Sequence, residues 1–82
     1  MRIDLYLKKT LIVKQRDTAK ELCDKGMVKV NGMLSKPSRE IREGDLIEID
    51  GSQGTLRYRV LKIPDGNVRK EEANEFYEGT GP

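Results

Sequence analysis

The residues of this sequence that could take part in chemistry are mostly cations, and they gather in the first half of the chain. Nine lysines and arginines precede residue 37: Arg2, Lys8, Lys9, Lys14, Arg16, Lys20, Lys25, Lys29 and Lys36. Arginine can hold a phosphate through two parallel hydrogen bonds, and lysine acts as a point charge. Each phosphate that is neutralised releases counterions, which favours binding to a polyanion at low salt. For any single lysine, a solvated helix face remains the ordinary explanation.

The charges are unevenly divided along the 82 residues. Residues 1–42 carry 11 Lys and Arg against 5 Asp and Glu, a net charge of +6, whereas residues 43–82 carry 5 against 9, a net charge of −4. The total is +2. This asymmetry predicts a basic half that faces a polyanion and an acidic half that faces water, although an ordinary solvated surface would explain it equally well.

The residue types that most enzymes need are scarce. Histidine is absent, which excludes Ser-His and Cys-His nucleophile pairs. The single cysteine, Cys23, excludes an intramolecular disulfide and a zinc knuckle, and no glycine-rich phosphate loop is present. We therefore predict a binding protein without cofactor or metal rather than an enzyme. Three tyrosines and one phenylalanine are too few for stacking on single-stranded bases, which favours recognition of folded RNA by shape and backbone.

The first predicted helix spans residues 2–10. Its apolar residues recur at helical spacing and should line one buried face: Ile3, Tyr6, Leu7 and Leu11. Arg2 and Lys9 are seven residues apart, so they should share another face, with Lys8 nearby. Asp4 could hold the Arg2 side chain in an intramolecular ion pair, which would orient the guanidinium group and leave it available for binding.

The second predicted helix spans residues 17–25, and Ala19, Leu22 and Cys23 form its apolar side. Thr18 and the Glu three residues later match a capping box, which would start the helix at Thr18. A start a few residues earlier would place Arg16 and Lys20 on one face. Cys23 should then be a buried small hydrophobic residue rather than a reactive thiol.

The rest of the chain has the pattern of a small sheet. Residues 27–30 alternate with a period of two, and Asn31-Gly32 is a strong hairpin signal before a second short strand. Further strands are predicted at 46–50 and 55–63, then a short helix or docked tail over 69–77, and residues 78–82 should be disordered. The sequence therefore predicts an α+β fold in which two N-terminal helices pack on a small, mainly antiparallel sheet.

An ordered set of short motifs resembles the S4 RNA-binding domain over roughly the first fifty residues. The motifs are Arg2-Ile3-Asp4-Leu5-Tyr6-Leu7, Lys14-Gln15-Arg16 with Ala19, Gly26 to Gly32, Lys36-Pro37-Ser38 and Gly44-Asp45. The remainder, with Arg69-Lys70-Glu71-Glu72-Ala73 and Phe76-Tyr77, is similar to the small stand-alone S4 proteins of bacterial ribosome-associated quality control, the RqcP group. The related ribosome-binding heat-shock S4 protein usually carries a longer basic extension. Leu5 and Gln15 stand where many members have other residues.

The resemblance implies the S4 fold (the alpha-L motif), with an S4 domain and an extra strand over 1–63 and a short, partly disordered C-terminal helix or tail over 64–82. It also implies binding of large-subunit rRNA and peptidyl-tRNA, in support of C-terminal alanine tailing of stalled nascent chains by a partner, the tailing factor. By position, Arg2 and Arg16 match the principal RNA-contacting arginines of the family. The weaker candidates for RNA contact are Lys8, Lys9, Lys14, Lys20, Lys29 and Lys36.

Other functions stay open. The chain could be a general S4 RNA-binding protein in ribosome assembly or heat-shock rescue, an adaptor whose acidic half binds a basic protein, or a DNA-binding module. With no apolar stretch long enough for a bilayer and no signal-peptide region, we expect a cytoplasmic, ribosome-associated monomer. Replacing Arg2 and Arg16 with alanine should leave the fold intact and weaken RNA binding by about 1–3 kcal/mol per arginine.

Overall fold

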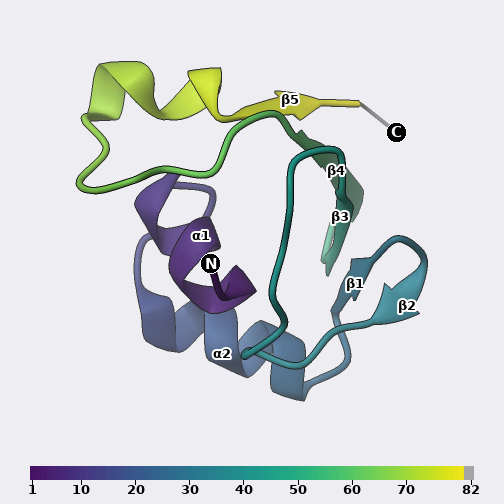
Figure 1. Ribbon diagram of the computed structural model, residues 1–82. Helices are drawn as coiled ribbons and strands as arrows, with labels where there is room; N and C mark the ends of the chain where they lie inside the picture. The colour runs from purple at the N-terminus through teal and green to yellow at the C-terminus, as the bar shows by residue number, and fades with distance from the viewer. Residues whose placement is uncertain (81–82) are drawn as a thin grey trace.

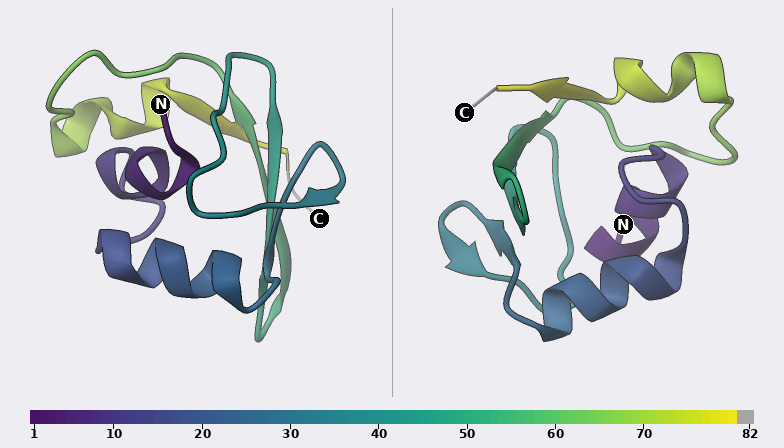
Figure 2. Two further views of the ribbon diagram at one scale, coloured as in Figure 1. Left: turned by 60° about the horizontal axis from the view of Figure 1, so that its bottom comes forward. Right: turned by 180° about the vertical axis from the view of Figure 1, so that it is seen from behind.

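The computed structural model of the protein describes residues 1–80. The chain forms α1 (Ile3–Lys9), α2 (Arg16–Asp24), β1 (Val28–Val30), β2 (Met33–Leu34), β3 (Leu46–Gly51), β4 (Gly54–Val60), the short 3-10 helix η1 (Lys70–Glu75) and β5 (Tyr77–Gly79). The strands make one antiparallel sheet in the order β2-β1-β3-β4-β5. Helices α1 and α2 cover one face of this sheet and leave the other open (Figures 1 and 2). The predicted fold class is confirmed.

Helix α1 buries the face that its spacing predicts, except at its end. Ile3, Tyr6 and Leu7 are fully buried. Leu11 is 45% exposed, so the prediction that it completes this face is wrong. The helix ends at Lys9, and Leu11 adopts a positive φ of 61° in the turn that follows, so helical periodicity no longer sets the direction of its side chain.

Helix α2 buries Ala19 and Cys23, as predicted. It begins at Arg16 rather than Thr18, because Gln15 has the extended backbone of an N-cap residue (φ −132°, ψ 145°) and no side chain caps this end. The predicted capping box is therefore wrong. The earlier start places the Arg16 side chain in the first turn of the helix, next to α1.

The Asn31-Gly32 turn joins β1 to β2, as predicted. The φ angles of 52° and 84° are ones that Asn and Gly tolerate. The Asn31 side chain also ties this turn to the start of β3. Its Nδ2 donates to Asp45 Oδ1 at 3.1 Å, and its Oδ1 accepts the N–H of Leu46 at 3.0 Å. These contacts fix the hairpin relative to the rest of the sheet.

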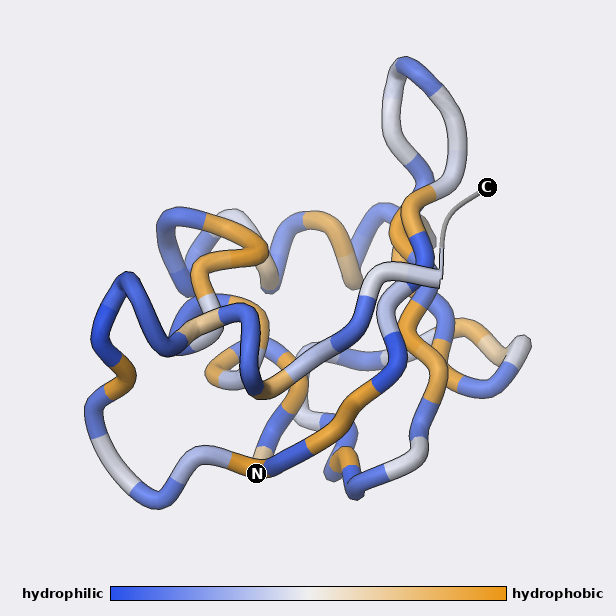
Figure 3. The backbone as a smooth tube through the Cα atoms, turned by 90° about the horizontal axis from the view of Figure 1, so that it is seen from above, coloured by the Kyte–Doolittle hydropathy of each residue, from blue (hydrophilic) through white to orange (hydrophobic). Residues whose placement is uncertain are grey.

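The hydrophobic core lies between the two helices and the inner face of the sheet. Alternate strand residues point into it, and the hydropathy along the backbone alternates accordingly (Figure 3). Val28 and Val30 on β1 lie opposite Ile49 and Ile47 on β3, and all four are buried. Within residues 1–80, the helices are too short or too polar to traverse a bilayer.

The C-terminal segment adds an edge strand to the sheet and packs over α1. Strand β5 pairs with β4, and η1 occupies the place of the predicted helix or docked tail. The hydroxyl of Tyr6 donates to the carbonyl oxygen of Phe76 at 2.7 Å. The predicted disorder over 78–82 is wrong for Glu78 and Gly79, because pairing with β4 supplies partners for this backbone. Residues 81–82 lie outside the described residues.

Candidate nucleic-acid interface

Asp4 on α1 joins two arginines into one group, Arg2, Asp4 and Arg16, called here the Asp4 cluster. The Asp4 side chain is completely buried, whereas those of Arg2 and Arg16 are 44% and 40% exposed. Arg2 Nη2 donates to Asp4 Oδ2 at 3.1 Å. Arg16 Nη2 donates a long hydrogen bond of 3.5 Å to Oδ1, and Arg16 Nε lies 3.4 Å from Oδ2. One carboxylate therefore holds both guanidinium groups while part of each faces solvent.

Burial of a carboxylate is costly unless the charge is paired and hydrogen-bonded. Asp4 meets this need with two cations and with the backbone N–H of Leu5, which donates to Oδ1 at 2.7 Å. The formal charge of the cluster is +1, because two arginines outweigh one carboxylate. Since the pairing restricts both guanidinium planes beforehand, less rotamer freedom is lost when they contact a phosphate. The expected pairing of Arg2 with Asp4 is confirmed, and the structure extends it to Arg16.

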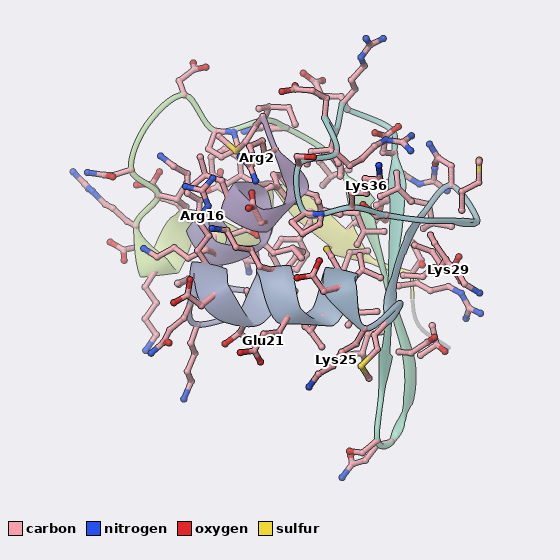
Figure 4. All side chains as sticks on the ribbon, turned by 90° about the horizontal axis from the view of Figure 1, so that it is seen from below. Arg2, Arg16, Glu21, Lys25, Lys29 and Lys36 are labelled. Carbon is pink, nitrogen blue, oxygen red and sulfur yellow. The ribbon has the colours of Figure 1, made fainter. Side chains whose placement is uncertain are left out.

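The loop between β2 and β3 packs on the start of α1. The backbone N–H of Ile3 donates to the carbonyl oxygen of Arg39 at 2.8 Å, and that of Asp4 donates to Pro37 at 3.2 Å. These bonds satisfy two of the N–H groups that a helix N-terminus leaves free. They also bring Lys36 to the side of the molecule on which the two arginines of the Asp4 cluster lie (Figure 4).

Three other predicted contacts lie on the helices or in the turn between them, and all are exposed. Lys8 follows Asp4 by one turn of α1, and Lys20 follows Arg16 by one turn of α2, so each lies beside the cluster on its own helix. Lys14 lies two residues before α2. We call the cationic surface the set formed by the Asp4 cluster together with Lys8, Lys14, Lys20 and Lys36.

Two predicted contacts lie elsewhere. The ammonium group of Lys9 donates to the carbonyl oxygen of Gly66 at 2.8 Å, so Lys9 holds the C-terminal segment against α1. Lys29 lies on the outward face of the sheet opposite Glu48, because the residues on either side of it are buried. The expected shared face of Arg2 and Lys9 is not formed, since Arg2 precedes the helix with extended backbone and turns to the Asp4 cluster.

Acidic residues also lie along the exposed face of α2. Asp17, Glu21 and Asp24 are exposed there at helical spacing. Figure 4 shows Glu21 across α2 from Arg2 and Arg16. These carboxylates would repel a phosphate chain, and Asp24 lies one turn after Lys20, so the acidic residues border the cationic surface.

Sequence reasoning missed two features of this surface. The first is the pairing of Arg16 with Asp4, for which a signal exists: a carboxylate beside the buried stripe of a helix requires a nearby cation. The second is the half-buried Arg39, whose carbonyl oxygen contacts the start of α1. No local sequence pattern predicts this contact of Arg39, because the docking of this loop depends on contacts distant in sequence.

The remaining reactive groups do not point to catalysis. Cys23 is buried, and desolvation, together with the nearby charges of Asp4 and Asp24, raises the pKa of its thiol to about 11. The thiol therefore stays protonated and unreactive at neutral pH. In the part of the chain that the structure describes, no group of Cys, Asp and Glu residues is arranged to hold a metal ion.

Comparison with known proteins agrees with this arrangement. The family model of the S4 domain matches residues 1–47, which include both helices, the β1–β2 hairpin and the start of β3. The RQC P-site tRNA stabilizing factor of Streptococcus pneumoniae is 44% identical over 78 residues, which cover 95% of this chain and 88% of that protein. The factor of Halalkalibacterium halodurans is 37% identical over 78 residues, with the same shares covered.

A solved structure gives the same result. The trimeric structure of Vibrio cholerae Heat Shock Protein 15 matches with a TM-score of 0.88 at 28% sequence identity, and the match covers 98% of this chain and 81% of that one. The resemblance inferred from the ordered motifs is thus confirmed. The protein belongs to the S4 domain family, in the group of relatives that carry the name RQC P-site tRNA stabilizing factor.

Proposed function

We propose that the protein is a non-enzymatic RNA-binding factor of ribosome-associated quality control. The observation that carries this proposal is the Asp4 cluster, in which a buried carboxylate orients two partly exposed arginines. Guanidinium groups oriented in this way suit the phosphate and base-edge acceptors of folded RNA. The relatives named RQC P-site tRNA stabilizing factor support the assignment to quality control.

Within this function, the protein binds large-subunit rRNA and peptidyl-tRNA together and thereby supports C-terminal alanine tailing of the stalled nascent chain by the tailing factor. The chain itself makes and breaks no covalent bond. It acts through binding free energy, because a protein that contacts rRNA and a correctly placed tRNA at once increases the population of that placement. The change in population is limited by the difference between the affinity of the protein for subunits with a correctly placed tRNA and its affinity for subunits with a displaced tRNA.

A single copy acts in the cytoplasm, with residues 1–63 as the RNA-binding unit and residues 64–82 as its support. The contacts of the C-terminal segment with α1, from Tyr6 to Phe76 and from Lys9 to Gly66, support this division of roles. They hold α1, and with it Asp4, against the sheet.

Large ribosomal subunits prepared with and without peptidyl-tRNA test the proposal. Each form is titrated with the protein at matched salt and pelleted through sucrose, and the proposal predicts tighter binding to the form that carries tRNA. Equal binding to both forms would contradict a role in stabilising tRNA. Binding to neither form would overturn the proposal.

The likeness to Heat Shock Protein 15 favours a second candidate, a more general S4 function in ribosome assembly or heat-shock rescue. Preferential sedimentation with assembly precursors or with tRNA-free subunits is the result that this candidate predicts. Adding assembly precursors to the same titration separates the two functions, because each predicts a different preferred particle.

A further inference from the structure

Leu11 has a backbone conformation that leucine rarely adopts. Its φ is 61°, in the left-handed region. The other positive φ angles within residues 1–80 belong to Gly26, Gly32, Gly44, Gly54 and Asn31, all residue types that tolerate this region. A β-carbon with a branched side chain is unfavourable there. Leucine at this position therefore opposes the local backbone preference, and an observed outlier of this kind is a reason to look for a function.

The positive φ itself is required by the way α1 ends. The N–H of Leu11 donates to the carbonyl oxygen of Lys8 at 3.1 Å, and the N–H of Val13 donates to Leu7 at 3.0 Å. The bond from Leu11 to Lys8 is of the type that closes a helix with one left-handed residue just past its end, where glycine is the usual residue. The turn thus explains the backbone of Leu11 and leaves the choice of side chain unexplained.

The core does not explain the side chain either. Ile12 and Val13 pack against the hydrophobic cluster, whereas Leu11 is 45% exposed. Residues 8–16 contain Lys8, Lys9, Lys14 and Arg16 and no acidic residue. Lys8 and Lys14, on either side of Leu11 along the chain, are exposed members of the cationic surface.

We propose that Leu11 is an RNA-contacting residue whose apolar side chain packs on ribose and base edges while Lys8 and Lys14 contact the neighbouring phosphates. The cations that flank Leu11, and the lack of acidic residues in the segment 8–16, favour a polyanion over a protein partner. The wide, shallow minor groove of an RNA helix exposes sugars and base edges that an aliphatic side chain can cover. This inference rests on the proposed function and adds one contact to the cationic surface.

The test compares four variants with the natural protein in the same subunit titration. Leu11→Asn and Leu11→Gly both suit a positive φ, so thermal unfolding should show that each keeps the fold. Both should weaken binding by about five- to tenfold, the effect of losing one buried aliphatic contact. Leu11→Met keeps an apolar side chain and should bind within about twofold of the natural protein. Leu56→Asn alters another exposed leucine, at the far end of the sheet, and should leave binding unchanged.

Three results overturn this inference. If the natural protein binds large subunits and both Leu11→Asn and Leu11→Gly bind equally well, Leu11 makes no contact and the proposed function stands. If the natural protein does not bind, the proposed function fails and the inference with it. A photo-crosslinking residue at position 11 should attach to RNA, and crosslinks to ribosomal protein alone would also overturn the inference.

Discussion

Replacement of Asp4 by asparagine separates the orientation of the arginines from their charge. The amide keeps the shape of the carboxylate and removes the negative charge that faces Arg2 and Arg16. Of the contacts at 3.1, 3.4 and 3.5 Å, only the first has the length of a strong hydrogen bond. Because both guanidinium groups are already partly exposed, they can return to water. We therefore expect the free energy of unfolding to fall by about 2 kcal/mol and the melting temperature by ~8–16 °C.

The direction in which Asp4→Asn changes the affinity for RNA distinguishes the effect of charge from the effect of orientation. The charge of the Asp4 cluster rises from +1 to +2, so an interaction driven by charge alone would become tighter. If orientation of the guanidinium groups matters, binding becomes weaker despite the added charge. We expect the affinity for large subunits to fall about tenfold, which corresponds to ~1.4 kcal/mol. A pelleting titration below the melting temperature of the variant measures this.

Glu48→Gln is the matched control. Glu48 pairs with Arg57 at 3.1 Å on the outward face of the sheet, so this change also removes one negative charge from an arginine-carboxylate pair. It should leave binding unchanged or slightly stronger. Tighter binding of Asp4→Asn to large subunits, equal to that of the control, would refute the view that Asp4 positions the arginines.

Lys20→Gln should weaken binding to large subunits more than Lys29→Gln, because only Lys20 lies on the cationic surface; the reverse order in a titration would contradict this placement. Asn31→Ala should lower the free energy of unfolding by about 1–2 kcal/mol, since two hydrogen bonds to the start of β3 are lost; an unchanged urea midpoint would show that these bonds contribute nothing. The Cys23 thiol should resist alkylation in the folded protein near neutral pH. Its pKa rises from 9.0 to about 11 on folding, so its stabilising contribution is complete below pH 9 and is lost as pH rises towards 11. Thermal unfolding of Cys23→Ala should show less of this alkaline loss.

The elements with strong local patterns could be predicted from the sequence. The helical spacing of Ile3, Tyr6 and Leu7 identified the buried face of α1, and the Asn31-Gly32 pair identified the first hairpin. Both signals depend on residues close together in the chain. For the same reason, the α+β arrangement and the family could be predicted before the structure.

The features that depend on distant contacts could not be predicted. The burial of Asp4 follows from the packing of α1 against Arg16 and the loop before β3, and the ordering of β5 follows from its pairing with β4. Leu11 has the helical spacing of the buried face, but the turn after Lys9 gives it a positive φ and directs its side chain elsewhere. The candidate arginines were found by type and by resemblance, whereas the carboxylate that joins them required the structure.

The burial of Asp4 also changes how the arginines should be tested. With Arg2 and Arg16 both replaced by alanine, Asp4 would be a buried charge without a partner, which costs about 3–5 kcal/mol. We therefore expect this double variant to lose stability, whereas the sequence alone predicted that it keeps its fold. Neutralising all three residues together avoids the problem.

The most direct test is co-sedimentation of two triple variants with large ribosomal subunits. Arg2→Gln/Asp4→Asn/Arg16→Gln neutralises the Asp4 cluster, and Glu48→Gln/Arg57→Gln/Arg59→Gln neutralises three residues of the outward sheet face. Each triple variant has a net charge one unit lower than that of the natural protein. The two variants therefore match in charge and differ only in the position of the substitutions. We predict that the second variant sediments with the subunits as the natural protein does, while the first stays at the top of the gradient. Equal sedimentation of both variants would contradict RNA binding through the Asp4 cluster.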